Sequence, residues 1–300
     1  MKGKLVLLGT SSGIPTKERN TTAVYLQFLG KGFLFDCGEG TQRQIFKADL
    51  NITKIDYMLL THLHGDHVLG APGLIQTLDF HGKNKLKIFG TPTTSQKIDC
   101  LLKGSIYNKE IQLQIKEIPP PATVTKIYEE KDFFINSISM NHVIDCIGYS
   151  FQEKDRKVYN KDLIQRLNLK KQDFIQLETQ GFVTKNSKTI KKEDVTTLKK
   201  GFKFTFITDT YETDNIIKLA KDSDILVIES TYFDEDDKAK EYKHLTLKYI
   251  LKIYPELNCK KIVLTHFSRK YASLDIFKKE IQMRNLDNIY LGYDFFSIQF

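Results

Sequence analysis

A short segment rich in metal-binding side chains, residues 61–67, constrains the fold of this 300-residue chain more than any other feature. It reads Thr-His-Leu-His-Gly-Asp-His and holds three of the seven histidines of the chain. Imidazole nitrogens beside a carboxylate suit Zn²⁺, with Mn²⁺ or Fe as alternatives, and disfavour Ca²⁺, which prefers oxygen ligands alone. A polar surface turn is the alternative, but it would rarely gather three histidines. The segment therefore predicts a metal site.

The residues on either side of this segment place it at the edge of a sheet. Ile55–Leu60 is a short apolar run that predicts a buried strand. A periodic stretch, Leu74–Phe80, follows the segment and predicts a helix. A strand, a metal-binding loop and a helix in this order are typical of an open α/β layer, which presents its sites at the ends of its strands.

Three more potential ligands stand at the ends of apolar runs elsewhere in the chain. His142 follows an alternating run that begins at Phe133, and Asp209 and His266 each close a short strand-like run. A single His or Asp at a strand end is often an ordinary cap. Because four strand ends repeat one placement, we expect these side chains to meet in a common site.

The cysteines and the hydropathy of the chain narrow the class of protein. Cys37, Cys100, Cys146 and Cys259 lie far apart without a Cys-x-x-Cys pair, which suits a reducing cytoplasm and argues against a disulfide framework. No apolar run approaches the ~18 residues that span a bilayer, so we expect no membrane segment. Three hundred residues without a repeat or an obvious linker predict a single α/β domain, residues 1–300.

The positive charge of the chain is concentrated in one segment. Residues 154–203 contain fourteen Lys or Arg against six Asp or Glu, an excess that equals the net charge of +8 of the whole chain. The rest of the chain is therefore neutral. A basic segment beside a metal site points to a polyanionic substrate such as a nucleic acid, and a solvated lysine-rich surface is the alternative.

At this point the motifs of the chain resemble a known family. The His-x-His-x-Asp-His segment with the distant His142, Asp209 and His266 resembles the metallo-β-lactamase fold, and further segments resemble its member ribonuclease Z, the short-form tRNA 3′-processing endoribonuclease. These segments are Gly9–Asn20, Phe35–Gln42, Thr61–Leu74, Asn141–Tyr149, Thr208–Thr210 and Leu264–Ser268. The resemblance implies an αββα sandwich with a protruding basic arm, residues 152–204, that acts as an exosite for tRNA. It also implies removal of the 3′ trailer from precursor tRNA, which leaves a 3′-hydroxyl.

The resemblance also assigns a two-metal site with two Zn²⁺ per subunit, or Mn²⁺. It implies that one metal is held by His62, His64 and His142, the other by Asp66, His67 and His266, and that Asp209 bridges them. Asp66 would in addition orient or deprotonate the attacking water. His244 would protonate the leaving 3′ oxygen, steered by Glu229, which stands in Ile-Glu-Ser-Thr where the family usually has His-Glu-Ala-Thr.

RNA contacts are implied by resemblance in three places. The loop with Lys17, Arg19 and Asn20 matches the Pro-x-Lys-x-Arg-Asn element of the family. After His266 the chain has Ser268-Arg-Lys-Tyr271, so that Lys270 stands where the family usually has Arg, and Lys cannot form the same bidentate phosphate clamp. The basic arm lacks the Gly-Pro motif of many bacterial members, and in it we expect phosphate contacts from Lys170, Lys171, Lys191 and Lys192.

Two other functions compete with this interpretation. A hydrolase of the same fold that acts on a small phosphodiester, lactone or thioester would need no basic arm. A non-catalytic RNA-binding protein would usually have lost ligands, whereas every expected ligand is present. We therefore expect a cytoplasmic, homodimeric endonuclease that acts on precursor tRNA.

Overall fold

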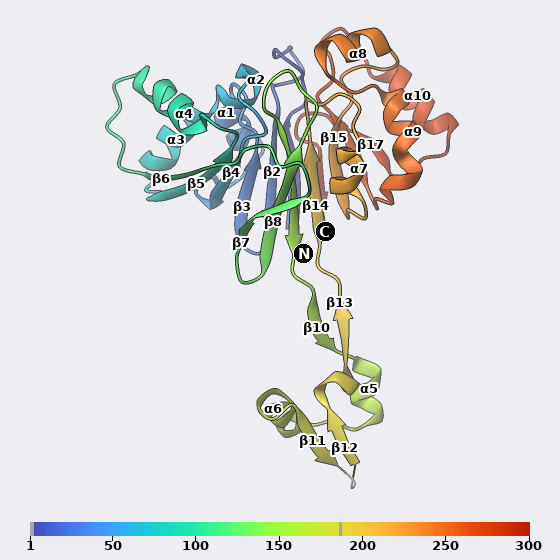
Figure 1. Cartoon of the computed structure of the whole chain (residues 1–300). Coiled ribbons are helices and arrows are strands. Elements are labelled where there is room, and N and C mark those ends of the chain that lie inside the picture. Colours follow the sequence, from blue (N-terminus) through green and yellow to red (C-terminus); the bar gives the residue numbers. More distant parts are fainter. Residues whose placement is uncertain (1–2, 186–187) are drawn as a thin grey trace. The chain divides into compact units, whose positions relative to one another are not determined.

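The computed structural model describes residues 3–185 and 188–300 (Figure 1). Within them the chain divides into two compact units. The first unit contains the described residues up to Glu129, together with Phe134–Phe151 and Lys203–Phe300, and the second contains Glu130–Phe133 and Gln152–Phe202.

One of the two large sheets of the first unit has the strand order β18-β1-β2-β3-β4-β5-β6. Strands β18, β1, β2 and β3 pair antiparallel, and β3 to β6 pair parallel. Its strands are β1 (Gly3–Gly9), β2 (Ala23–Phe28), β3 (Lys31–Phe35), β4 (Ile55–Leu59), β5 (Lys85–Gly90), β6 (Gln112–Glu117) and β18 (Ser297–Gln299). The predicted strand at Ile55–Leu60 is confirmed as β4.

The second sheet has the order β17-β16-β15-β14-β9-β8-β7. Strands β14 to β17 pair parallel, so their carboxyl ends share one edge, while β7 and β8 pair antiparallel. Its strands are β7 (Thr125–Glu129), β8 (Phe133–Ser139), β9 (Ile147–Glu153), β14 (Lys203–Ile207), β15 (Ile225–Glu229), β16 (Ile262–Thr265) and β17 (Ile289–Leu291).

Most helices of the first unit lie on the outer faces of the two sheets. Figure 1 shows α1, α3 and α4 beside the first sheet and α7, α9 and α10 beside the second. The helices of this unit are α1 (Thr41–Lys47), α2 (Gly65–Val68), α3 (Ala71–Phe80), α4 (Thr94–Lys103), α7 (Asn215–Ala220), α8 (Asp236–Tyr242), α9 (Leu247–Leu257) and α10 (Asp275–Met283), with the 3₁₀ turn η1 (Ile52–Lys54). The predicted αββα sandwich is thus confirmed, and the helix predicted at Leu74–Phe80 is α3, which begins three residues earlier.

Aromatic side chains fill the space between the two sheets. The ring of Phe33 lies 4.9 Å from that of Phe151, and the ring of Phe35 lies 5.0 Å from that of Phe204. The opposite faces of the sheets pack on the helices, as Leu226 and Ile228 of β15 do. Because side chains alternate along a strand, Glu229 at the end of β15 points to the face opposite these two residues.

The second unit has a small apolar core of its own. Strand β10 (Arg156–Tyr159) pairs with β13 (Thr196–Lys199), and β11 (Phe182–Lys185) pairs with β12 (Lys188–Lys191). Two helices, α5 (Lys161–Arg166) and α6 (Lys171–Thr179), and the 3₁₀ turn η2 (Lys192–Val195) complete it. The buried core residues are Leu169, Leu177, Val183, Ile190 and Val195.

None of the helices in the described part of the chain is long and apolar enough to cross a membrane.

Candidate metal centre

Seven histidine and aspartate side chains converge at the strand ends of the first unit. The segment 61–67 follows β4 and contributes four of them, partly through the short helix α2. His142 follows β8, Asp209 follows β14 and His266 follows β16. The structure therefore brings together all the residues that the sequence suggested as ligands, from both sheets.

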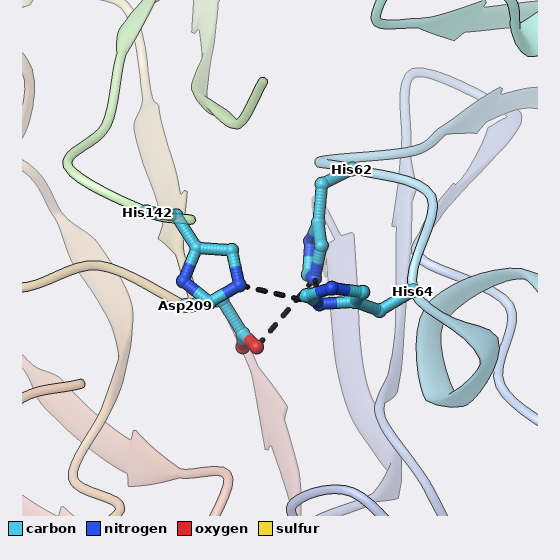
Figure 2. Close-up of side chains that lie close together, drawn as sticks. All are labelled: His62, His64, His142 and Asp209. Carbon is cyan, nitrogen blue, oxygen red and sulfur yellow. Dashed lines mark hydrogen bonds and ion pairs between the residues drawn. The ribbon is translucent and has the colours of Figure 1, made fainter. Parts of the chain in front are cut away.

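One group of potential ligands consists of His62, His64, His142 and Asp209, whose donor atoms lie within 4.8 Å of one another (Figure 2). Nδ1 of His64 lies 3.0 Å from Nε2 of His62 and 3.2 Å from Nε2 of His142. The Oδ2 atom of Asp209 lies 3.6 Å from Nε2 of His62. Three ring nitrogens and a carboxylate oxygen thus face one small volume.

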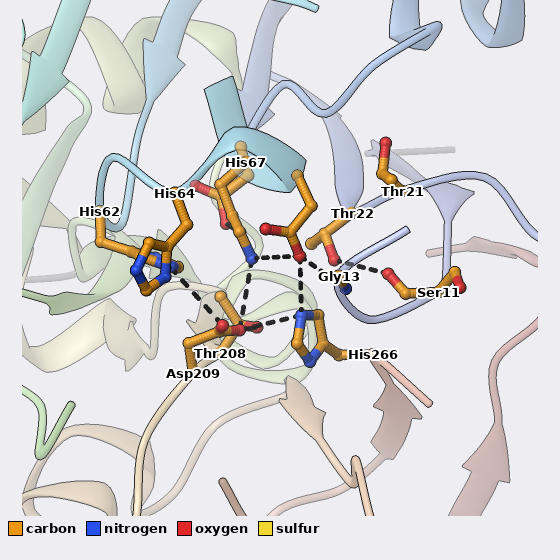
Figure 3. Close-up of polar contacts among 12 residues, drawn as sticks. Ser11, Gly13, Thr21, Thr22, His62, His64, His67, Thr208, Asp209 and His266 are labelled. Atoms are coloured by element: carbon orange, nitrogen blue, oxygen red, sulfur yellow. Dashed lines mark hydrogen bonds and ion pairs between the residues drawn. The ribbon is translucent and has the colours of Figure 1, made fainter. Parts of the chain in front are cut away.

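The other group consists of Asp66, His67 and His266. Figure 3 shows His67 and His266 beside Asp209. Oδ2 of Asp66 lies 3.2 Å from Nε2 of His67 and 3.5 Å from Nε2 of His266. The Oδ1 atom of Asp209 lies 3.4 Å and 3.0 Å from the same two nitrogens. Asp209 therefore presents one carboxylate oxygen to each group.

The chemistry of these residues fits a pair of divalent cations. Nε2 of His67 and Nε2 of His266 are buried and make no hydrogen bond, although such groups nearly always have a partner. Burial lowers the pKa of His67, but Asp209, Asp66 and Asp36 raise it well above its usual value. A cation would satisfy both the unpaired nitrogens and the negative charge of these carboxylates, and imidazole with carboxylate ligands suits zinc.

Three strand ends turn into the site through a left-handed backbone. Asp36 after β3, Asp209 after β14 and His266 after β16 have φ values of 55°, 49° and 58°. Asp and His are among the non-glycine residues that tolerate this conformation best, and such backbone is frequent at functional sites. The turn directs the side chains of Asp209 and His266 toward the shared volume and the side chain of Asp36 toward the ring of His67.

Asp36 is a functional candidate to which the sequence assigned no role. Its buried carboxylate accepts a hydrogen bond from the backbone N–H of Thr61 at 2.7 Å and lies 2.7 Å from Nδ1 of His67. It therefore holds the ring of His67 with Nε2 directed at the other ligands. The signals in the sequence were its position directly after the apolar run of β3, the placement shared by the ligands themselves, and its place in the family-like segment Phe35–Gln42.

Glu229 lies at the centre of a buried hydrogen-bond network. It accepts hydrogen bonds from the backbone N–H groups of Thr210 at 2.6 Å and Leu245 at 3.1 Å, and from the hydroxyl of Thr231 at 2.5 Å. The Thr231 hydroxyl in turn lies 3.0 Å from Nδ1 of His266. One carboxylate thus supports a ligand of the metal centre through a single intervening hydroxyl.

His244 lies against the same carboxylate. Its Nδ1 is 3.2 Å from Oε2 of Glu229. Burial lowers the pKa of His244, but Glu229 raises it, to about 9. His244 lies in the segment between α8 and α9, because α9 begins at Leu247 with Thr246 as its N-cap and continues through Pro255 to Leu257.

A cleft of about 250 Å³ opens over the metal centre. It is lined by Ser12, Gly13, His64, Asp66, His142, Val143, Asp209, Glu241, Tyr242 and His244. The backbone N–H of Gly13 donates to Oδ2 of Asp66 at 2.8 Å, which ties the loop before β2 to a ligand. The side chains of Asp66 and His244 are therefore both accessible from one opening.

The residues suggested for RNA contact in the first unit differ in their environments. Lys17 is exposed. The guanidinium of Arg19 donates to the carbonyl oxygens of Ser268 and Tyr271 at 3.2 and 3.0 Å, and so ties the loop at 15–20 to the segment that follows His266. Part of the hydrogen-bonding capacity of the Arg19 guanidinium is thus taken up by acceptors within the protein.

Two further residues of this set are also engaged within the protein. The backbone N–H of Asn20 donates to Asp294 at 2.7 Å, and its side-chain amide donates to the carbonyl oxygen of Glu39 at 2.7 Å. Lys270 forms an ion pair with Glu235, and its ammonium lies 4.6 Å from the ring centre of Tyr271. A phosphate at this position would therefore compete with Glu235 for Lys270.

The lysines suggested in the basic arm lie on the second unit. Lys170 and Lys171 are exposed at the start of α6, and Lys191 is exposed at the end of β12. Lys192 pairs with Glu178 at 2.5 Å, and Lys191 has only a loose pair with Glu193 at 3.9 Å. The exposed lysines keep their ammonium groups in solvent.

Known ribonuclease Z proteins are similar to this chain in sequence, and a solved tRNase Z is similar to it in structure. Ribonuclease Z of Nanoarchaeum equitans is 38% identical over 270 residues, which cover 89% of this chain and 84% of that protein. Ribonuclease Z of Bacillus cereus is 33% identical and covers 92% of each chain. Among solved structures, the short form of human tRNase Z has a TM-score of 0.73 and 25% identity, and the match covers 99% of this chain and 98% of that one.

Two other similarities are broader. The metallo-β-lactamase fold protein YhfI of Bacillus subtilis has a TM-score of 0.67 at 16% identity, which shows the shared fold. A family model described as anti-Pycsar protein Apyc1 matches residues 3–179. Both similarities include the segment 61–67.

Proposed function

Since this chain belongs to the ribonuclease Z family and is an endoribonuclease, we propose that it removes the 3′ trailer from precursor tRNA and leaves a 3′-hydroxyl, by two-metal phosphodiester hydrolysis with zinc. The observation that carries the proposal is the pair of ligand groups that share Asp209. When bound, two such cations would activate water and neutralise charge on the phosphate. His62, His64 and His142 would hold one of them, Asp66, His67 and His266 the other.

Asp66 and His244 are the proposed acid–base pair. Asp66 reaches the cleft with one carboxylate oxygen fixed by the backbone N–H of Gly13, and it would orient the attacking water and accept its proton. Nδ1 of His244 contacts the carboxylate of Glu229, so Nε2 is the ring nitrogen available to a substrate. It would give its proton to the leaving 3′ oxygen, and the raised pKa keeps it protonated near neutral pH.

Precursor tRNA is the proposed partner, held by sequence-independent phosphate contacts. The exposed Lys17, Lys170, Lys171 and Lys191 would make such contacts, with contributions from Lys192, Arg19, Asn20, Ser268 and Lys270. Phosphate contacts suit an enzyme that accepts every tRNA, because they read no base sequence. We also propose a homodimer in the cytoplasm; the four free cysteines suit a reducing compartment.

The proposal is tested by incubating the purified protein with a 5′-labelled precursor tRNA and mapping each cut to the nucleotide. We expect one cut at the 3′ end of the mature tRNA, loss of cleavage with a chelator, and recovery on addition of Zn²⁺ but less with Mn²⁺. A small phosphodiester serves as the alternative substrate. Turnover of that ester without any cut in the precursor would contradict the proposal.

Substitution of single ligands tests which residues hold the metal. His62→Ala or Asp209→Ala should lose bound metal and trailer cleavage together, because each removes a donor from the buried site. The matched control is Asp56→Asn, on β4 but in a half-buried ion pair with Lys83 and outside the ligand groups, which should keep both properties. Full metal content with full activity in His62→Ala or Asp209→Ala would refute the assigned site.

A further inference from the structure

Two large apolar side chains stand exposed on the wall of the cleft over the metal centre. Tyr242 is 52% exposed and Val143 is 59% exposed, and both line the cleft together with His64, Asp66 and His142. Neither side chain has a part in the hydrolysis proposed above. Exposed apolar groups in a concave site usually mark the position of a ligand, since that is where their burial is gained.

The position of these two side chains follows from the same turn that places His244. Tyr242 is the last residue of α8, and Lys243 ends the helix with a left-handed backbone, φ 59°. The carbonyl oxygen of Lys243 lies 3.3 Å from Nδ1 of His142, the residue before Val143. The rings of His142 and His244 are 5.8 Å apart. Tyr242 and Val143 are therefore each one residue away from this contact.

We propose that Tyr242 and Val143 form the binding site for the base of the last tRNA nucleotide, the one directly 5′ of the cut. This inference rests on the proposed function. The 3′ oxygen that leaves belongs to that nucleotide, and His244 is placed to protonate it. The nucleotide must therefore lie on the side of the cleft formed by His244, which is also the side of Tyr242.

The chemistry of other lining residues supports this position. Ser12 and Gly13 line the cleft as well but offer no large apolar surface to a base. A tyrosine ring stacks on any of the four bases, because every base has a π-face. At about 250 Å³ the cleft lies below the ~300–1,000 Å³ range of pockets for drug-sized ligands, which suits a single base.

The test compares Tyr242→Ala, Tyr242→Phe and a control in cleavage of precursor tRNA. Stacking on an aromatic side chain is lost in the Ala variant, so kcat/KM should fall about 5- to 150-fold, while the Phe variant retains most of the activity. The control is Phe80→Ala, which removes an exposed aromatic side chain at the end of α3 that does not line this cleft. Phe80→Ala should match the unmodified protein.

A second set of substrates separates stacking from a displaced His244. One precursor lacks the base of the last tRNA nucleotide, and another lacks the base of the first trailer nucleotide. The loss in Tyr242→Ala should disappear only with the first of these, because no base remains to stack, and the bound metal should stay unchanged. An equal loss on all three substrates, or coupling to the first trailer nucleotide, would overturn the assignment. If the unmodified protein cuts no precursor at all, the proposed function fails and this inference fails with it.

Discussion

The contact between Asp36 and His67 gives a sharp test of how the metal centre is organised. Oδ1 of Asp36 accepts the Thr61 backbone N–H at 2.7 Å, and Oδ2 lies 2.7 Å from Nδ1 of His67. With Asp36 ionised, Nδ1 of His67 must carry the hydrogen, which leaves the lone pair of Nε2 free for a cation. Replacing Asp36 by Asn changes this in a predictable way.

In Asp36→Asn the amide oxygen can keep the hydrogen bond from Thr61, so that the amide NH₂ faces His67. The ring must then accept at Nδ1 and carry its hydrogen on Nε2, which is the tautomer that cannot bind a cation. The left-handed backbone of Asp36, φ 55°, is one that Asn tolerates, so the fold should survive. Loss of such a support typically costs 10–100-fold in metal affinity, or about 1.4–2.7 kcal/mol.

The affinity is measured by competition between the metal-free protein and a chromophoric zinc chelator. The far-UV circular dichroism spectrum checks the fold, and Asp56→Asn serves as the control variant. We expect weaker zinc binding only in Asp36→Asn, with a matching loss of precursor cleavage at limiting zinc. Equal zinc affinities for both variants and the unmodified protein would show that Asp36 does not set the tautomer of His67.

Three further predictions concern the acid, the basic arm and a buried carboxylate. His244→Ala should slow RNA cleavage by about 10²–10⁴-fold but hardly affect hydrolysis of a p-nitrophenyl phosphodiester, because that leaving group needs no proton. Equal losses of rate on the two substrates would show that His244 is not the general acid. Replacing residues 155–200 by a Gly-Ser linker should weaken tRNA binding and flatten its salt dependence while small-substrate turnover is kept, as measured by titrations at several salt concentrations; a parallel loss of turnover would make the segment structural. Burial raises the pKa of Asp294 to about 6. Since the folded protein then binds the proton more tightly than the unfolded chain, Asp294 loses stabilising effect as pH rises from about 4 to 6. Over that pH range, denaturant titrations should show that the free energy of unfolding of the unmodified protein falls relative to that of Asp294→Asn. A constant difference between the two proteins would refute the pKa shift.

The positions of the ligands could be predicted from the sequence because strand ends have a clear local signal. An apolar run followed by His or Asp marks both the element and the edge at which it ends, and that was sufficient for His142, Asp209 and His266. Asp36 shows the same pattern after β3 but supports a ligand instead. Sequence alone does not distinguish the two roles, since they differ only in which atom the side chain contacts.

Other parts of the site depend on contacts between distant segments. Arg19 carries a motif that indicates phosphate binding, yet its guanidinium also donates to two carbonyl oxygens some 250 residues away in the chain. Nothing local to residue 19 reveals those acceptors. The turn that holds His244 is likewise set by the left-handed backbone of Lys243 and by Thr246, which caps α9.

The ligands of both groups come from two different sheets. The first sheet contributes His62, His64, Asp66 and His67, and the second contributes the rest. A cation in either group would therefore cross-link the two halves of the sandwich, and its binding free energy would add to that of the aromatic interface between them. Bound cations would thus hold the two sheets together besides serving catalysis, so that the resistance of this chain to heat or denaturant would depend on the supply of metal.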